Sequence, residues 1–387
     1  MPPTPCNLGT SSEVDAARWD SRLTISHFRL IPPSRRAVQA RGPTAEAWVR
    51  FAGSVANPAR ICDTNNIPSC IAYPTRKKGA VRLACRNDAF PLLPHETLLD
   101  LIAALGFDAY ELIFLGERPP LPLSRVRDDL ERTADAVAEQ VAARNLTWSD
   151  VFVIPANDFT AMAANHPDPD ERAAGRLVFS EMLEFVARIG APGLTMLPGI
   201  DWPGESHDQS LARSAAELSE RATEARDRGL RFSIEPHMGS LCHTPEDVLR
   251  LCEMAPGLEL TLDYGHYTAA GIADEQLEPL LPHTRHFHTR PAAPGRLQTP
   301  LKENTIDFER AIDLLAKYGY DGFILVEYLW AELDARLDNV DILSETIMLR
   351  DRLRAKLDGL PWSYPNFGEF DTETQPPRTS DSPARLS

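Results

Sequence analysis

Four side chains of the kinds that bind metal ions recur in the C-terminal half of the chain, each at the end of a short apolar run. They are Glu235, Asp263, His288 and Glu327, which close the runs LRFSIE, LELTLD, TRHFH and GFILVE. The intervals of 28, 25 and 39 residues are about the length of one strand and its return helix. Because the C-terminal ends of consecutive parallel strands in a closed sheet lie on one rim, these residues would converge there. Three carboxylates and an imidazole suit one divalent metal ion, namely Mn²⁺, Mg²⁺, Co²⁺ or Zn²⁺.

Strand-like and helix-like segments alternate through the part of the chain that would position these residues. Strand patterns precede the four runs at Val81–Cys85, Ala109–Leu115, Asp150–Pro155 and Leu194–Leu197. Helical patterns lie at His95–Leu105, Ser124–Asn145, Glu171–Ile189, Gln209–Arg228, Pro245–Glu253, Glu275–Leu281, Ile306–Tyr318 and Ile342–Leu357. This alternation predicts an α/β fold, a (β/α)8 TIM barrel over residues 80–360. A doubly wound open sheet also alternates, but no G-x-G-x-x-G or P-loop opens the first helix.

The two ends of the chain differ in composition from this central region. Residues 1–79 are rich in Pro, Ser and Arg, and they hold eleven Lys and Arg against five Asp and Glu. The stretch from 361 to 387 repeats the theme with QPPRTSDSPARLS. Such compositions bury little apolar surface, so we expect a low-order extension at 1–79 and a disordered tail at 361–387.

Composition and charge exclude several classes of function. The net charge is −16, and the part beyond residue 79 is more acidic still, so its surface would repel nucleic acid. No apolar run is long enough to cross a membrane, and no secretory signal is apparent at the start. The six cysteines form no C-x-x-C pair, which favours reduced thiols and a cytoplasmic location.

Several motifs around the four residues resemble the xylose-isomerase-like TIM-barrel superfamily, and most closely its sugar phosphate isomerase/epimerase branch. The motifs are IEPHMG, LDYGHY, HFHTRPA, KENTIDF and ILVEYLW. The resemblance implies that Glu235, Asp263, His288 and Glu327 hold the metal. It also implies that Glu235 and Glu327 are the catalytic acid/base pair. His266, in an Asp-x-x-His pattern, would contact the substrate.

Other polar residues near these motifs are candidates for contact with a small, sugar-like substrate. His237 lies two residues beyond Glu235, and Arg290 and Arg296 lie two and eight residues beyond His288. The resemblance implies an Arg a few positions after the metal His that contacts substrate hydroxyls, as in ketose epimerases, and the sequence leaves open whether Arg290 or Arg296 corresponds to it. His286, Glu111, Asn157, Asp158, His207, Gln298, Lys302 and Trp330 are further residues that the same rim would bring near the site.

The implied chemistry is removal of a proton next to a metal-chelated carbonyl, by a carboxylate. Return of the proton from the opposite face gives an epimerase, and return to the neighbouring carbon gives an isomerase. A dehydratase of the inosose or dehydroshikimate type begins with the same step and then loses a hydroxyl. An endonuclease-IV-like repair enzyme would need an Asp-x-His pair after the His288 run, and PGRLQTPLKEN contains neither residue. A non-catalytic metal-binding barrel is the remaining alternative. The resemblance also allows a homo-oligomer.

Overall fold

The protein is a closed barrel of eight parallel strands, each hydrogen-bonded to the next and β8 to β1. This computed structural model describes residues 81–330 and 336–365. The expected extension at 1–79 and the tail beyond 365 lie outside the described residues. The strands are β1 Arg82–Arg86, β2 Ala109–Leu115, β3 Thr147–Ile154, β4 Gly193–Met196, β5 Arg231–Ile234, β6 Glu259–Asp263, β7 Thr284–Thr289 and β8 Phe323–Val326. The predicted (β/α)8 barrel is therefore confirmed.

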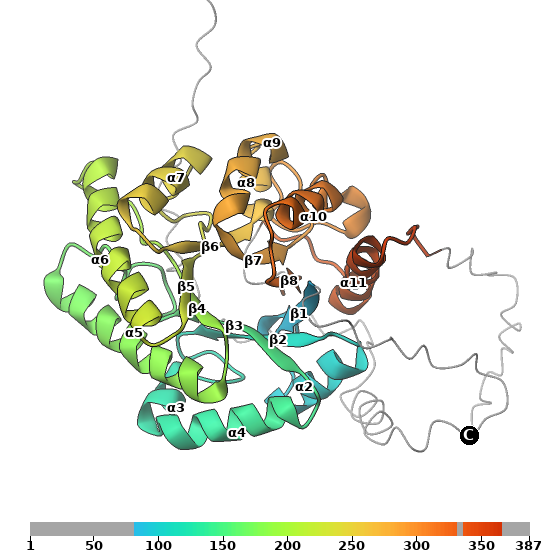
Figure 1. Cartoon of the computed structure of the whole chain (residues 1–387), viewed down its shortest axis with the longest axis horizontal. Coiled ribbons are helices and arrows are strands. Elements are labelled where there is room, and N and C mark those ends of the chain that lie inside the picture. Colours follow the sequence, from blue (N-terminus) through green and yellow to red (C-terminus); the bar gives the residue numbers. More distant parts are fainter. Residues whose placement is uncertain (1–80, 331–335, 366–387) are drawn as a thin grey trace, which may run out of the picture.

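Helices surround the strands, and the colours in Figure 1 run from blue to red once around the barrel. They are α2 His95–Ala104, α3 Leu123–Asp128, α4 Leu130–Ala142, α5 Pro169–Ile189, α6 His207–Asp227, α7 Pro245–Met254, α8 Tyr264–Ala269, α9 Asp274–Leu277, α10 Phe308–Lys317 and α11 Ile342–Asp358, with 3₁₀ turns η2 Asn87–Ala89, η3 Glu278–His283 and η4 Leu301–Glu303. None of the helices in the described part is long and apolar enough to span a bilayer.

Two predicted helices are interrupted, for reasons that the sequence contains. The helix expected over Ser124–Asn145 breaks at Asp129, whose backbone is not helical and so ends α3, and whose carboxylate accepts a hydrogen bond from the N–H of Arg132 to cap α4. The helix expected over Glu275–Leu281 continues as 3₁₀ from residue 278, because Pro279 and Pro282 have no N–H for α-helical bonds. The short helix α8 directly after β6 was not predicted.

Alternation along the strands separates two cores. On β2, Leu112 and Phe114 join the large apolar cluster between barrel and helices, where Phe114 meets Phe185 of α5 edge-on at 5.7 Å. Glu111 and Ile113 alternate with them and face the barrel interior. Ala84, Ala109, Phe323 and Leu325 form one apolar part of that interior.

A polar layer fills the interior between β3 and β7. Thr195, Ser233 and Thr261 hydrogen-bond to one another at 2.7 to 2.9 Å, and all are fully buried. Arg285 donates to Asp150 at 2.7 Å and to Ser233 at 2.7 Å. The layer lies among the same inward-facing side chains as the candidate ligands, so the barrel positions charged groups within its own core.

Candidate metal centre and active site

The four predicted ligands occupy equivalent places on four neighbouring strands. Glu235 follows β5, Asp263 ends β6, His288 lies near the end of β7, and Glu327 follows β8. Their exposed fractions are 0 to 2%. Charged groups are this deeply buried only when they are paired or coordinate an ion, so the burial itself indicates a built site.

Three of the four converge on one point. Nδ1 of His288 lies 3.1 Å from Oε1 of Glu235 and 3.1 Å from Oε2 of Glu327. One ligand-type atom from each of these residues lies within 4.8 Å of the others. Two carboxylates and an imidazole at this spacing can bind one divalent cation between them.

Asp263 lies beside this group but is turned toward other partners. Its Oδ1 accepts a hydrogen bond from the N–H of Gly265 at 2.7 Å, and its Oδ2 accepts one from Arg290. Burial raises the pKa of Asp263 more than Arg290 lowers it. Its role as a fourth ligand stays a prediction, and it would require Oδ2 to exchange Arg290 for the metal.

The ring nitrogen of His288 that faces away from Glu235 and Glu327 contacts a carboxylate from β2. This nitrogen, Nε2, lies 3.2 Å from Oε2 of Glu111, which also binds Nε2 of His286 at 2.6 Å. Burial would lower the pKa of His288, but the carboxylates of Glu111, Glu235 and Glu327 outweigh it and raise the pKa well above its usual range. Glu111 thus supports the ring from the side opposite Glu235 and Glu327.

Arg86 was not among the predicted residues, although, like the predicted ligands, it lies at the C-terminal end of a strand. It ends β1, is 5% exposed, and places Nη1 3.3 Å from Oε2 of Glu327 and 3.7 Å from Oε1 of Glu111. Asp88 holds the rest of its guanidinium at 2.5 and 2.6 Å. The polar residue that ends the run VRLACR is the signal in the sequence that marks this position.

The predicted substrate-contacting residues divide into two groups. Nε2 of His266 lies 2.9 Å from Nη2 of Arg290, and its ring lies 3.9 Å from that of His237. Arg290 also places Nη1 3.2 Å from Oε1 of Glu327, so these three residues adjoin the cluster. Arg296 instead binds Glu303 and Asp338 in the outer loops, each at 2.8 Å, with 38% of its side chain exposed.

The further rim candidates are placed as follows. His286 hydrogen-bonds to Glu111, as described above. Asp158 accepts hydrogen bonds from Thr160 and Ala161 and so orders the loop after β3. Gln298 ties the loop after β7 to the backbone of Leu329. His207 begins α6 and binds Asp201 and Asp247, away from the four ligands.

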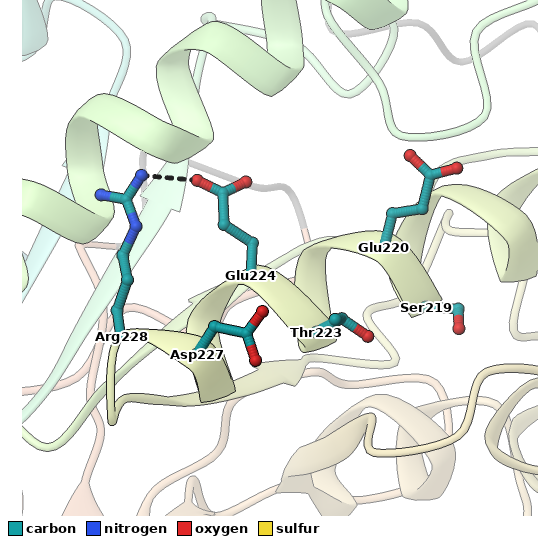
Figure 2. A pocket seen from close by; sticks show the side chains of 6 residues that line it. All are labelled: Ser219, Glu220, Thr223, Glu224, Asp227 and Arg228. Atoms are coloured by element: carbon teal, nitrogen blue, oxygen red, sulfur yellow. Dashed lines mark hydrogen bonds and ion pairs between the residues drawn. The ribbon is translucent and has the colours of Figure 1, made fainter.

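A surface hollow of about 430 Å³ lies on α6, away from the buried cluster at the strand ends. Figure 2 shows its lining, which comes from α6 and the residue that follows it: Ser219, Glu220, Thr223, Glu224, Asp227 and Arg228. Glu224 already accepts hydrogen bonds from Arg228 and from Ser180 of α5, each at 2.7 Å. A hollow with no convergent reactive groups is not the active site, whereas the buried strand-end cluster has them.

Two atoms of the cluster have no hydrogen-bond partner among the described residues. His288 Nδ1 and Glu327 Oε2 are buried and make no hydrogen bond of good geometry within the described residues. Buried polar atoms are normally satisfied, so such atoms facing one another are typical of an ion site. The donor set of imidazole nitrogen and carboxylate oxygens therefore fits a divalent metal.

Comparison with known proteins identifies the family of the chain. The model of the family described as xylose isomerase-like TIM barrel matches residues 99–351, so the chain belongs to that family. An inosose dehydratase of Glaesserella parasuis serovar 5 (strain SH0165) is 28% identical over 157 residues, which are 34% of this chain and 51% of that relative. The match thus spans about half of that relative's length.

Solved structures share the fold at low sequence identity. A 3-keto-D-glucoside 4-epimerase from E. coli superposes with a TM-score of 0.55 and 17% identity, over 71% of this chain and 99% of that one. A xylose isomerase-like TIM barrel protein from Mycobacterium smegmatis, in complex with magnesium, gives 0.52 and 16%, over 72% and 97%. At these identities the likeness concerns the barrel alone.

Proposed function

We propose that this member of the xylose isomerase-like family is a divalent-metal-dependent isomerase or epimerase of a sugar or related small polyhydroxy carbonyl compound. The observation that carries the proposal is the buried convergence of Glu235, His288 and Glu327 at strand ends. Membership of the xylose isomerase-like family supports the same reaction class.

The residues that would hold the metal are Glu235, His288 and Glu327, with Asp263 as the predicted fourth ligand. A divalent ion supplies Lewis-acid stabilisation of the negative charge that develops on the substrate carbonyl. His288 would bind the metal through Nδ1 when that nitrogen carries no proton, while the N–H of its other nitrogen donates a hydrogen bond to Glu111. The protein thus presets the ring's orientation and tautomer.

The proton-moving groups are the two glutamates. Burial raises the pKa of Glu327, but Arg86 and Arg290 outweigh that effect and hold it below its usual range, so Glu327 is ionised at neutral pH. An ionised carboxylate accepts a proton from the carbon beside the substrate carbonyl. Glu235 and Glu327 follow β5 and β8, so the substrate would lie between them, with one removing the proton and the other returning it.

His266 and Arg290 would orient the substrate. Burial, together with His237 and Arg290, holds the pKa of His266 well below its usual value, so the ring is neutral. A neutral imidazole has one N–H donor and one acceptor, which suits recognition of a sugar hydroxyl. Arg290 carries positive charge next to Asp263 and Glu327 and limits repulsion among the carboxylates.

A dehydratase is the second candidate, because the inosose dehydratase is a sequence relative. It would use the same carboxylate to remove the proton and would then expel a hydroxyl from the next carbon. The two candidates therefore share Glu235, Glu327 and the metal, and they differ in the fate of the substrate.

The test is incubation of the metal-replete full chain with ketoses, sugar phosphates and inososes in deuterated water. Deuterium entering beside the carbonyl reports proton abstraction, and the product's mass separates isomerisation from loss of water. Glu235→Gln should lower the rate by about 10²- to 10⁴-fold, the usual contribution of a positioned acid or base.

Glu253→Gln, on the exposed side of α7, is the matched control and should exchange deuterium at the wild-type rate. Equal exchange by Glu235→Gln and wild type would remove Glu235 from catalysis. A product lighter by one water would replace the isomerase with the dehydratase.

A further inference from the structure

A second cluster of histidine and aspartate lies outside the site described above and shares no residue with it. Asp201 belongs to the loop after β4, His207 is the first residue of α6, and His243 lies in the loop before α7. One ligand-type atom from each lies within 4.8 Å of the others. Three separate segments thus bring two imidazoles and a carboxylate together.

Asp201 stands between the two histidines. Its Oδ1 is 2.9 Å from Nδ1 of His207, and its Oδ2 is 2.6 Å from Nε2 of His243. The exposed fractions of these side chains are 38% for Asp201, 30% for His207 and 54% for His243. The cluster is therefore open to solvent on one side.

His207 faces carboxylates at both ring nitrogens. While Nδ1 faces Asp201, Nε2 lies 3.0 Å from Oδ1 of Asp247. Ionised carboxylates only accept hydrogen bonds, and a neutral imidazole can donate only one. The ring must therefore carry either a second proton or a cation at Nδ1.

Hydrogen bonds from Thr244 hold the carboxylate of Asp247 in position beside His207. Its Oδ2 accepts hydrogen bonds from the N–H of Thr244 at 3.2 Å and from the hydroxyl of Thr244 at 2.9 Å. Its Oδ1 faces the imidazole of His207 and lies 3.8 Å from Nη1 of Arg250. A carboxylate that holds the far nitrogen of a histidine is the usual support of a metal-binding imidazole. Asp247 thus directs the lone pair of Nδ1 toward Asp201 and His243.

We propose that Asp201, His207 and His243 form a second divalent-metal site, of the zinc class, with Asp247 as the carboxylate behind His207. Two imidazoles and one carboxylate with one open side match the three-ligand zinc sites that keep a position for water. The site links the loop after β4 to the loop before α7. It is independent of the function proposed for the buried cluster.

The test measures metal bound by the full chain after chelator stripping, with Zn²⁺ as the probe. Wild type should bind one equivalent more than His243→Ala, whose target side chain is the most exposed of the three. His283→Ala is the matched control, because His283 is an exposed histidine of η3 outside every candidate ligand group among the described residues, and it should bind as wild type does.

Two further variants keep the result interpretable. Asp247→Asn should retain the equivalent but weaken its affinity about 10- to 100-fold, as loss of a supporting carboxylate does. Glu235→Gln, in the buried cluster, should leave the difference between wild type and His243→Ala unchanged, so the failure of one site does not mimic failure of the other.

Cobalt gives an independent readout. Co²⁺ added to wild type should produce visible absorption that His243→Ala lacks and His283→Ala keeps. Equal zinc stoichiometry and equal cobalt spectra in wild type and His243→Ala would overturn the proposal and assign the cluster to a protonated histidine clamp. Comparison of melting curves without metal verifies that His243→Ala is folded.

Discussion

At the residue scale, Glu111 has the most specific role among the groups that are not themselves predicted ligands. Burial would raise the pKa of Glu111, but His288 and the hydrogen bond from His286 outweigh it and hold the pKa well below its usual range. Glu111 is therefore an ionised acceptor for both imidazoles. It fixes which nitrogen of His288 faces Glu235 and Glu327, and this choice decides whether the ring can act as a ligand.

Glu111→Gln should raise the dissociation constant for Mn²⁺ about 10- to 100-fold, the usual effect of removing a supporting carboxylate. The amide preserves the side chain's size while removing the charge that orients His288. Isothermal titration of the stripped full chain with Mn²⁺ measures the change. Glu139→Gln, exposed on α4, is the control. Unchanged affinity in Glu111→Gln would show that His288 either does not bind the metal or does not need this support.

At the element scale, two shifts in strand register turn side chains toward the barrel interior that strict alternation would direct outward. Between β6 and β7, Leu260 pairs with Thr284 and Thr261 with His286, which leaves Arg285 as the extra residue. Between β2 and β3, Ser149 is extra in the same way. A bulge lets two successive residues of a strand reach one side. Arg285 and His286 consequently both contact groups inside the barrel, namely Asp150 and Glu111.

The start of a helix is set by a local signal, the capping residue, and the cap of α4 by Asp129 can be tested. Asp129→Ala should lower the free energy of unfolding by about 1 kcal/mol, because the N–H of Arg132 loses its side-chain acceptor. Urea denaturation followed by circular dichroism measures the change. Asp128→Ala, one residue earlier and also exposed, is the control and should be nearly neutral. Equal stability of the two variants would mean that the break between α3 and α4 does not depend on this cap.

At the scale of the whole molecule, the barrel is closed around charge rather than around apolar side chains alone. Arg285 reaches from β7 across to Asp150 of β3, and Ser233 and Thr195 complete its hydrogen bonds. Asp150 and Arg285 are 0 and 4% exposed. Removing one member of such a pair leaves a buried charge without its partner, which costs far more than losing a surface pair.

Asp150→Ala should therefore lower the free energy of unfolding by about 3 to 5 kcal/mol, measured by chemical denaturation. The double variant Asp150→Ala with Arg285→Met should recover much of that loss, because the unpaired charge is removed with its partner. Asp135→Ala breaks the exposed pair with Arg188 and should remain close to wild type. A double variant as unstable as Asp150→Ala would show that the polar layer, and not charge pairing, is what the barrel requires.

The barrel and the four strand-end residues could be predicted from the sequence because both are repeating patterns. Apolar runs ending in Glu235, Asp263, His288 and Glu327 mark the strands, and parallel closure then brings their ends to one rim. Helix starts such as Thr244 before Pro245 are equally local, and the structure has a capping box there. Patterns of this kind act over a few residues, so the sequence alone determines them.

The partners of those residues were decided only by the tertiary structure. Arg86 contacts Glu327, and Glu111 contacts His288, from strands remote in sequence. The side chain of Asp263 accepts a hydrogen bond from Arg290, a contact that the pattern of metal-ligand residues did not predict. The bulge at Arg285 and the meeting of His207 with His243 likewise depend on how whole elements pack. Chain closure determines which distant side chains become neighbours, and no local pattern of residue types records that choice.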